Sequence, residues 1–208
     1  MTQLPLPLET RPALGREDFI VAEANRDAVA MIDRYPDWPA QAIALFGPAG
    51  SGKSHLASVW AARAGARIAG TAALDDAEAV AIEDVDAGPP DAARDALVFG
   101  LIERGMPLLL TGREPPARWQ ATLPDLASRY RALLAFPLWA PDDAMLAALA
   151  RKLFADRQLG VPDAVVEQML RALERSPAAV RDFVRRVDER ALAEKKPISA
   201  KLVRDLLA

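Results

Sequence analysis

Residues 47–54, which read GPAGSGKS, restrict what this chain can fold into more than any other part of the sequence. They match the pattern G-x-x-x-x-G-K-[ST] at every fixed position. The apolar run Ala42–Phe46 before them has the length of a strand, and the run His55–Ala64 after them has a helical pattern. A strand, a glycine-rich turn and a helix in this order predict a nucleotide-binding phosphate loop.

The residue types of this loop suit the binding of phosphates. Glycines let the backbone bend so that successive N–H groups point at a β-phosphate, and the start of the helix adds a favourable dipole. Lys53 is expected to reach the β- and γ-phosphates, and the Ser54 hydroxyl is expected to bind Mg²⁺. An accidental glycine-rich turn of this pattern is expected in roughly one of a few hundred chains. The candidate nucleotide-binding residues here are Gly47, Pro48, Ala49, Gly50, Ser51, Gly52, Lys53, Ser54 and His55.

The composition is that of a folded globular chain. With 208 residues, of which 51% are hydrophobic, it can bury a core of full domain size and can divide into a medium and a smaller domain. It has no cysteine, no signal-peptide pattern and no apolar run long enough to span a bilayer. We therefore expect a cytoplasmic protein without a membrane partner.

Charge is spread unevenly along the chain. The formal net charge of -3 argues against a dedicated DNA-binding surface. Residues 1–150 carry a net charge of -7, whereas residues 151–208 carry +4. This asymmetry would suit head-to-tail packing in a homo-oligomer, or a basic lid over phosphates. Two ordinary solvated surfaces would explain it equally well.

The first residues of the chain read as a docking peptide. Residues 3–8 are QLPLPL, and the alternating prolines exclude a helix and favour an extended backbone. Such a peptide can place leucines in a hydrophobic groove of a partner, although many disordered termini also contain Leu and Pro. The hexapeptide resembles the bacterial sliding-clamp-binding motif. The candidate partner-binding residues are Gln3, Leu4, Leu6 and Leu8, and a linker follows them.

Carboxylates follow a later strand. The apolar run 78–82 is predicted to be a strand, and Glu83, Asp84 and Asp86 come directly after it. In phosphate-loop ATPases the acidic end of such a strand helps to hold Mg²⁺ and polarises the attacking water. Glu83 and Asp84 are therefore candidate catalytic residues, and Glu83 is paired with Ser54 as a candidate metal ligand. The alternative is an acidic surface loop.

The remaining patterns indicate two parts of different architecture. Further strands are predicted at 66–69, 107–111 and 133–136, with a helix over 91–104, so strands alternate with helices up to residue 140. This alternation predicts an α/β core with a parallel sheet covered on both faces. After Pro141 the pattern is helical only, with breaks at residues 160–162, 176–177 and 196–197. We expect a tail and linker over 1–17, a core over 18–140 and a small helical domain over 141–208.

Taken together, these residues resemble the AAA+ ATPases of the bacterial replication-initiator (DnaA) type, and within them the short regulatory homologues of the Hda type. The resemblance covers nearly the whole chain, and it implies a five-stranded parallel AAA+ core followed by an all-helical lid. It implies ADP or ATP, with Mg²⁺, as the cofactor. The segment Asp18–Arg26 resembles the family's adenine-pocket segment, which makes Ile20 and Asn25 candidate nucleotide-binding residues.

The resemblance also assigns three residues beyond the loop. Thr111, in the segment LTGREPP, stands nearest to the polar sensor 1 position. Arg129, in DLASRY, is implied to be an arginine finger that reaches the γ-phosphate of a neighbouring subunit. Arg181, in SPAAVR, is implied to lie over the nucleotide of its own subunit. A single arginine is more often a surface residue, so the order and context of these segments carry the assignment.

Departures from the family pattern bear on activity. Glu83 stands where the initiator usually has Asp, and Arg113 where it often has Asp, so weak or no intrinsic ATPase activity is expected. Ser54 and Glu83 are separated by 28 residues, too few for the insertion with which initiators grip single-stranded DNA. The 27 residues after Arg181 leave no room for the initiator's helix-turn-helix domain. No sequence-specific DNA binding is therefore expected.

These expectations combine into a regulatory function. The resemblance implies a nucleotide-bound protein that docks on the DNA polymerase III sliding clamp and makes the initiator DnaA hydrolyse its ATP. The alternative is a helicase-loader-type AAA+ ATPase that hydrolyses its own ATP. A small-molecule kinase is disfavoured, because the helices after Pro141 offer no evident acceptor site.

Overall fold

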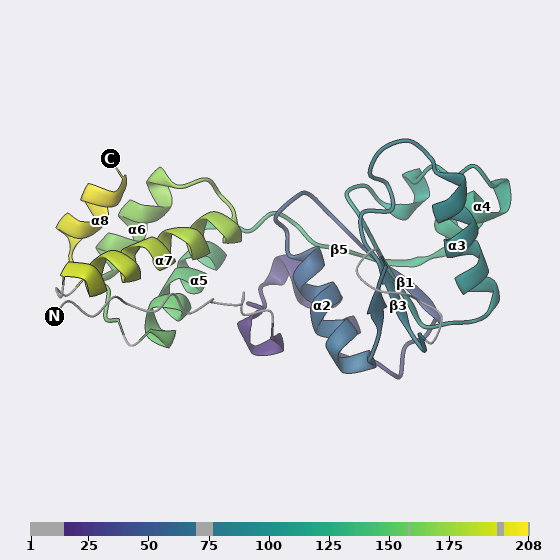
Figure 1. The fold of residues 1–208 in the computed structure, drawn as a ribbon, viewed down its shortest axis with the longest axis horizontal. Coiled ribbons are helices and arrows are strands. Elements are labelled where there is room, and N and C mark those ends of the chain that lie inside the picture. Colours follow the sequence, from purple (N-terminus) through teal and green to yellow (C-terminus); the bar gives the residue numbers. More distant parts are fainter. Residues whose placement is uncertain (1–14, 70–76, 158, 195–197, 208) are drawn as a thin grey trace, which may run out of the picture.

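The structure, a computed structural model, describes residues 15–69, 77–157, 159–194 and 198–207. It consists of a sheet covered by helices and a separate group of helices, which lie side by side along the long axis of the molecule (Figure 1). The predicted docking residues Gln3, Leu4, Leu6 and Leu8 lie outside the described residues.

Strands and helices alternate through the first part of the chain, as their apolar patterns predict. The short 3-10 helices Arg16–Asp18, Glu23–Asn25 and Pro116–Arg118 lie in its connections. The regular elements are α1 (Arg26–Asp33), β1 (Ala42–Phe46), α2 (Lys53–Ala64), β2 (Arg67–Ile68), β3 (Val80–Ile82), α3 (Ala92–Glu103), β4 (Leu108–Gly112), α4 (Pro124–Ala132) and β5 (Leu134–Pro137).

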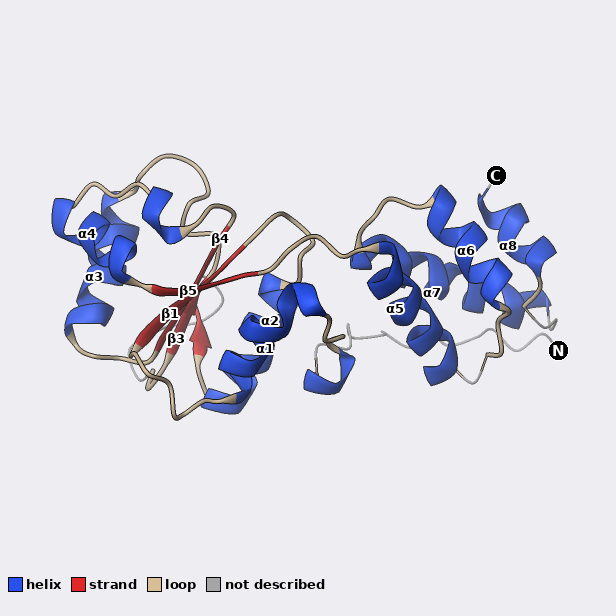
Figure 2. Ribbon diagram, turned by 180° about the vertical axis from the view of Figure 1, so that it is seen from behind, coloured by secondary structure: helices blue, strands red, loops and turns tan. Residues whose placement is uncertain are grey.

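The five strands form one parallel sheet in the order β2-β3-β4-β1-β5. Helices α1 and α2 cover one face, and α3 and α4 cover the other (Figure 2). Strand β1 lies between β4 and β5, with Leu45 opposite Thr111 and Phe46 opposite Gly112. The phosphate loop therefore leaves the sheet at the carboxyl end of an inner strand, where open α/β sheets bind ligands.

The second part is all helical. Its helices are α5 (Asp143–Asp156), α6 (Asp163–Ala172), α7 (Pro177–Glu194) and α8 (Ala200–Leu207). They enclose a core of their own, which includes Phe154, Val166 and Phe183. The predicted α/β core with a five-stranded parallel sheet and a helical lid is confirmed.

The lid contacts the segment that precedes α1, which we call the leading segment (residues 15–25). Ile20 packs against the apolar core of the lid. Lys152 of α5 forms an ion pair of 2.9 Å with Asp18. Within the part of the chain that the structure describes, no helix combines the length and apolarity needed to cross a membrane.

Candidate functional site: a cavity between the phosphate loop and the lid

The phosphate loop has a backbone that only glycine accommodates at its first position. Gly47 has φ +152°, and a Cβ atom there would lie 1.9 Å from the carbonyl oxygen of Leu138. The N–H of Gly47 donates to the carbonyl of Gly112 at 3.1 Å. The loop is therefore bonded to the end of β4 and packs tightly against the residue that follows β5.

Lys53 is the first residue of α2, and its side chain is folded over the loop. Its ammonium donates to the carbonyls of Gly47 at 2.7 Å and Pro48 at 2.9 Å. Burial lowers the pKa of Lys53, while the charge of Asp84 acts in the opposite direction. A buried ammonium beside bent backbone N–H groups is suited to binding an anion.

A cavity of about 370 Å³ lies between the loop and the lid. This volume falls in the range of sites for small molecules. The leading segment, the loop, the ends of β3 and β4, and helices α5 and α7 all contribute to its wall. The lining residues are Asp18, Phe19, Ile20, Ala49, Gly50, Ser51, Gly52, Lys53, Ser54, His55, Asp84, Arg113, Met145, Leu146, Leu149, Pro177, Ala178 and Arg181.

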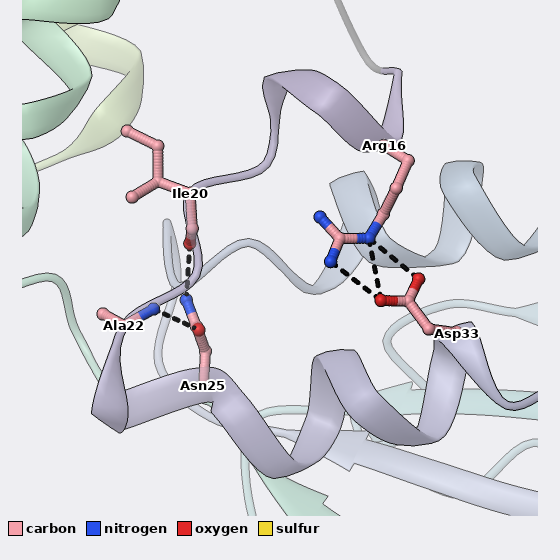
Figure 3. A network of polar contacts seen from close by, with 5 residues as sticks. All are labelled: Arg16, Ile20, Ala22, Asn25 and Asp33. Atoms are coloured by element: carbon pink, nitrogen blue, oxygen red, sulfur yellow. Dashed lines mark hydrogen bonds and ion pairs between the residues drawn. The ribbon is translucent and has the colours of Figure 1, made fainter.

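The leading segment is held in place by Asn25. The Asn25 side chain is buried; its amide nitrogen donates to the carbonyl of Ile20 at 3.0 Å, and its oxygen accepts from the N–H of Ala22 at 2.8 Å (Figure 3). Arg16 is tied to Asp33 of α1 in the same region, at 2.8 Å. Asn25 is absent from the described lining, so it fixes the backbone that presents Ile20 and does not itself face the cavity.

The carboxylates after β3 point in different directions. Asp84 lines the cavity and has a left-handed backbone with φ +49°. Glu83 is not among the described lining residues, and its Oε1 atom is buried without a hydrogen-bond partner in the described structure. The Asp86 carboxylate accepts hydrogen bonds from the N–H groups of Arg113 and Glu114.

The structure places the two residues of the predicted Mg²⁺ ligand pair differently with respect to the cavity. Ser54 lines the cavity, whereas Glu83 does not. No group of three or more His, Asp or Glu side chains that could hold a metal ion exists among the described residues. The described lining thus offers one hydroxyl, from Ser54, and one carboxylate, from Asp84, so waters and phosphate oxygens would have to complete the near-octahedral oxygen coordination that Mg²⁺ requires.

Thr111 is buried and tied to the turn after β3. Its hydroxyl accepts from the N–H of Asp84 at 3.0 Å, and its carbonyl accepts from the N–H of Val85 at 2.8 Å. Thr111 is not among the described residues of the cavity wall. Thr111 is therefore positioned to hold Asp84 in place and not to contact a ligand in this cavity.

The two arginines implied by the resemblance lie in different places. Arg181 of α7 lines the cavity, and burial lowers its pKa although Asp18 lies nearby. Arg129 of α4 is exposed and forms an ion pair with Glu103 of α3. None of the described lining residues belongs to α4, so Arg129 is positioned away from the cavity of its own chain.

Sequence reasoning does not assign several lining residues. Phe19 contacts the ring of His55 edge-on, with 5.1 Å between the ring centroids. Met145, Leu146 and Leu149 are predictable as one apolar face of a lid helix. Helical periodicity predicts that such a face is buried. It does not predict that residues of this face lie next to the phosphate loop, which is about 90 residues earlier in the chain. Asp18, Pro177 and Ala178 also line the cavity; they lie in the segments 18–26 and 176–181, which the resemblance places near the nucleotide, but it gives them no role of their own.

Comparison with known proteins shows which solved structures have this architecture. No protein-family profile matches the sequence, and no curated protein matches it. The solved structure of domain III of the replication initiation protein DnaA of Thermotoga maritima is similar to the chain, with a TM-score of 0.76 and 17% identity over 95% of this chain and 96% of that one. The chain has the AAA+ fold of DnaA domain III.

Other AAA+ structures agree. DnaA of Aquifex aeolicus bound to AMPPCP has a TM-score of 0.67 and 15% identity over 89% of this chain and 70% of that one. A variant of RuvB from Thermotoga maritima has a TM-score of 0.68 and 17% identity over 93% of this chain and 71% of that one. At these identities the likeness concerns the fold alone.

Proposed function

We propose that this chain is a nucleotide-bound regulator of replication initiation, of the Hda type. It would bind ADP or ATP in the cavity, dock on the DNA polymerase III sliding clamp through residues 3–8, and stimulate ATP hydrolysis by the initiator DnaA through Arg129. In this proposal residues 1–17 are the clamp-binding tail and linker, 18–140 the AAA+ core and 141–208 the lid.

The observation that carries the proposal is the separation of Arg129 from the cavity. The cavity contains Lys53 and Arg181, two cations that suit the phosphates of a nucleotide bound in the same chain. Arg129 is exposed on α4, so its guanidinium is accessible to another molecule. A guanidinium supplied by a neighbour stabilises the transition state of phosphoryl transfer and raises its rate by about 10³ to 10⁵.

The helicase-loader-type alternative has one observation in its favour. Asp84 lines the cavity, and a carboxylate there could orient water for hydrolysis of the chain's own ATP. Against it, Arg113 lines the same cavity and Glu83 does not. Intrinsic turnover of ATP distinguishes the two functions, because a rate of order ~1 per second, within the range of ordinary enzymes, would support the alternative.

The direct test measures turnover of DnaA-bound ATP in the presence of the chain and of clamp loaded on DNA. Arg129→Ala should lower the stimulated rate at least about 100-fold while ADP binding and clamp binding stay intact. Arg131→Ala is a matched control, because Arg131 is exposed on the same helix and contacts Ser128. Full stimulation by Arg129→Ala would refute action in trans.

The proposed binding to the sliding clamp is tested separately. Replacing Gln3, Leu4 and Leu6 by alanine should abolish clamp binding in a pull-down or calorimetric titration without changing the melting temperature. Persistent clamp binding would refute the docking role of the tail. A lower melting temperature would show instead that these residues belong to the fold.

A further inference from the structure

The described wall of the cavity has an excess of positive charge. Lys53, Arg113 and Arg181 are the cations among the described lining residues, and Asp18 and Asp84 are the anions. Asp18 is paired with Lys152 of the lid at 2.9 Å, which compensates its charge from outside the lining. The described wall therefore contributes three cations and only one carboxylate, that of Asp84, whose charge is not compensated by an ion pair.

Arg113 is held in position through its backbone. Its N–H donates to both carboxylate oxygens of Asp86, at 2.9 and 2.8 Å, and the N–H of Glu114 donates to the same group at 2.7 Å. Asp86 thus joins the turn after β3 to the end of β4. The guanidinium of Arg113 is exposed and makes no hydrogen bond or ion pair with the part of the chain that is described, so its donors remain free for a ligand.

The same contacts remove carboxylates from a metal site. Asp86 is occupied by backbone N–H groups, and Glu83 has a buried oxygen and does not line the cavity. Arg113 stands among the described lining residues together with Asp84, where its charge opposes the approach of a divalent cation. Two of the three carboxylates after β3 are thus absent from the described lining, and a guanidinium stands there beside the third.

We propose that Arg113 is a phosphate-binding residue that supplies the positive charge usually contributed by a divalent cation, so that the chain binds nucleoside di- and triphosphates without a metal. This inference rests on the proposed nucleotide site. A guanidinium donates to two phosphate oxygens at once and keeps its proton at neutral pH. Binding without a metal would also suit a chain that retains its nucleotide and acts on that of a partner.

The test is calorimetric titration of the full chain with ADP, in buffer with EDTA and in buffer with MgCl₂. Wild type should have dissociation constants within about threefold of each other in the two buffers. Arg113→Ala should bind ADP about 10- to 100-fold more weakly in EDTA, as expected for lost charge-assisted hydrogen bonds, and should lose less in MgCl₂. Arg113→Lys keeps the charge and loses the planar fork, so its ADP affinity in EDTA should lie between those of wild type and Arg113→Ala.

Arg118→Ala is the matched control, because Arg118 is an exposed arginine five residues away that pairs with Glu114 and lies outside the described lining. It should bind ADP as wild type does in both buffers. Wild-type binding that is about 100-fold weaker in EDTA than in MgCl₂, or an unchanged affinity of Arg113→Ala, would overturn the role of Arg113 and leave the nucleotide site standing. If wild type binds no nucleotide in either buffer, the proposed function fails as well.

Discussion

The hydroxyl of Thr111 accepts a hydrogen bond from the N–H of Asp84 at 3.0 Å and so links the end of β4 to the turn after β3. The next residue, Gly112, accepts from the N–H of Gly47 and links β4 to the phosphate loop. Two adjacent residues of one strand thus set the relative positions of the loop and of the carboxylate that faces the cavity. Thr111 acts on this site through Asp84.

Replacement of Thr111 by Val tests this linkage, because it keeps the shape and removes the acceptor. We expect the free energy of unfolding to fall by about 1 kcal/mol. The amide proton of Asp84 should also exchange faster with solvent, which NMR measures. An unchanged exchange rate would show that the hydrogen bond does not protect this turn.

The inner strands of the sheet, β3, β4 and β1, were predictable because they are largely apolar runs. The inner strand β1 has the predicted bounds, Ala42–Phe46, and three of its five residues are buried. The same logic found the lid helices from their apolar faces. The hydrophobic pattern and the order of the elements along the chain are therefore sufficient to predict the type of an element whose apolar residues are buried.

The orientation of polar side chains was harder to predict. Glu83 and Asp84 are adjacent in sequence, yet only Asp84 of this pair lines the cavity, and its left-handed backbone is not encoded by residue type alone. Asn25, a candidate nucleotide-binding residue, bonds to the backbone of the leading segment and is absent from the described lining. A motif identifies the residue types of a site, whereas the turns around them decide which side chains face it.

The ion pair between Lys152 and Asp18 predicts a pH-dependent contact between lid and leading segment. The hydrogen bond from Lys152 lowers the pKa of Asp18, and the same bond chiefly raises the pKa of Lys152. A carboxyl with a lowered folded-state pKa stabilises the fold above its unfolded pKa of about 3.9, and this contribution is lost as the pH falls through the folded pKa.

Lys152→Met should therefore lower the free energy of unfolding by about 0.5 kcal/mol at pH 7. In urea titrations its difference from wild type should shrink as the pH falls below about 3.9, the unfolded pKa of Asp. Asp156→Asn is the control, because Asp156 is the second carboxylate partner of Lys152 and belongs to the same helix. A difference of equal size at both pH values would assign the effect to packing of the Lys152 stem and not to its charge.

Lys53 provides the most direct test of the nucleotide site. Lys53→Met keeps the length of the side chain and removes the ammonium, which leaves only backbone dipoles and the two arginines to compensate the phosphates. ADP affinity should fall at least about 100-fold by calorimetry. Lys201→Met, at an exposed position of α8, should leave the affinity unchanged. Equal affinities for wild type and Lys53→Met would refute the assignment of the site.

The pairing of Arg129 with Glu103 makes a last prediction, which depends on the proposed action in trans. Both side chains are about half exposed, and an ion pair of this kind contributes only about 0 to 1 kcal/mol, so a phosphoryl group of a partner can displace the Glu103 carboxylate at little cost. Glu103→Gln should therefore stimulate DnaA-bound ATP turnover as well as wild type does, or up to about fivefold faster, because 1 kcal/mol corresponds to about that factor. The assay again uses clamp loaded on DNA, and circular dichroism should show an unchanged fold. If Glu103→Gln instead lowers the stimulated rate more than tenfold while the fold and clamp binding are intact, then Glu103 orients the Arg129 guanidinium, and the ion pair belongs to the working arrangement of the finger.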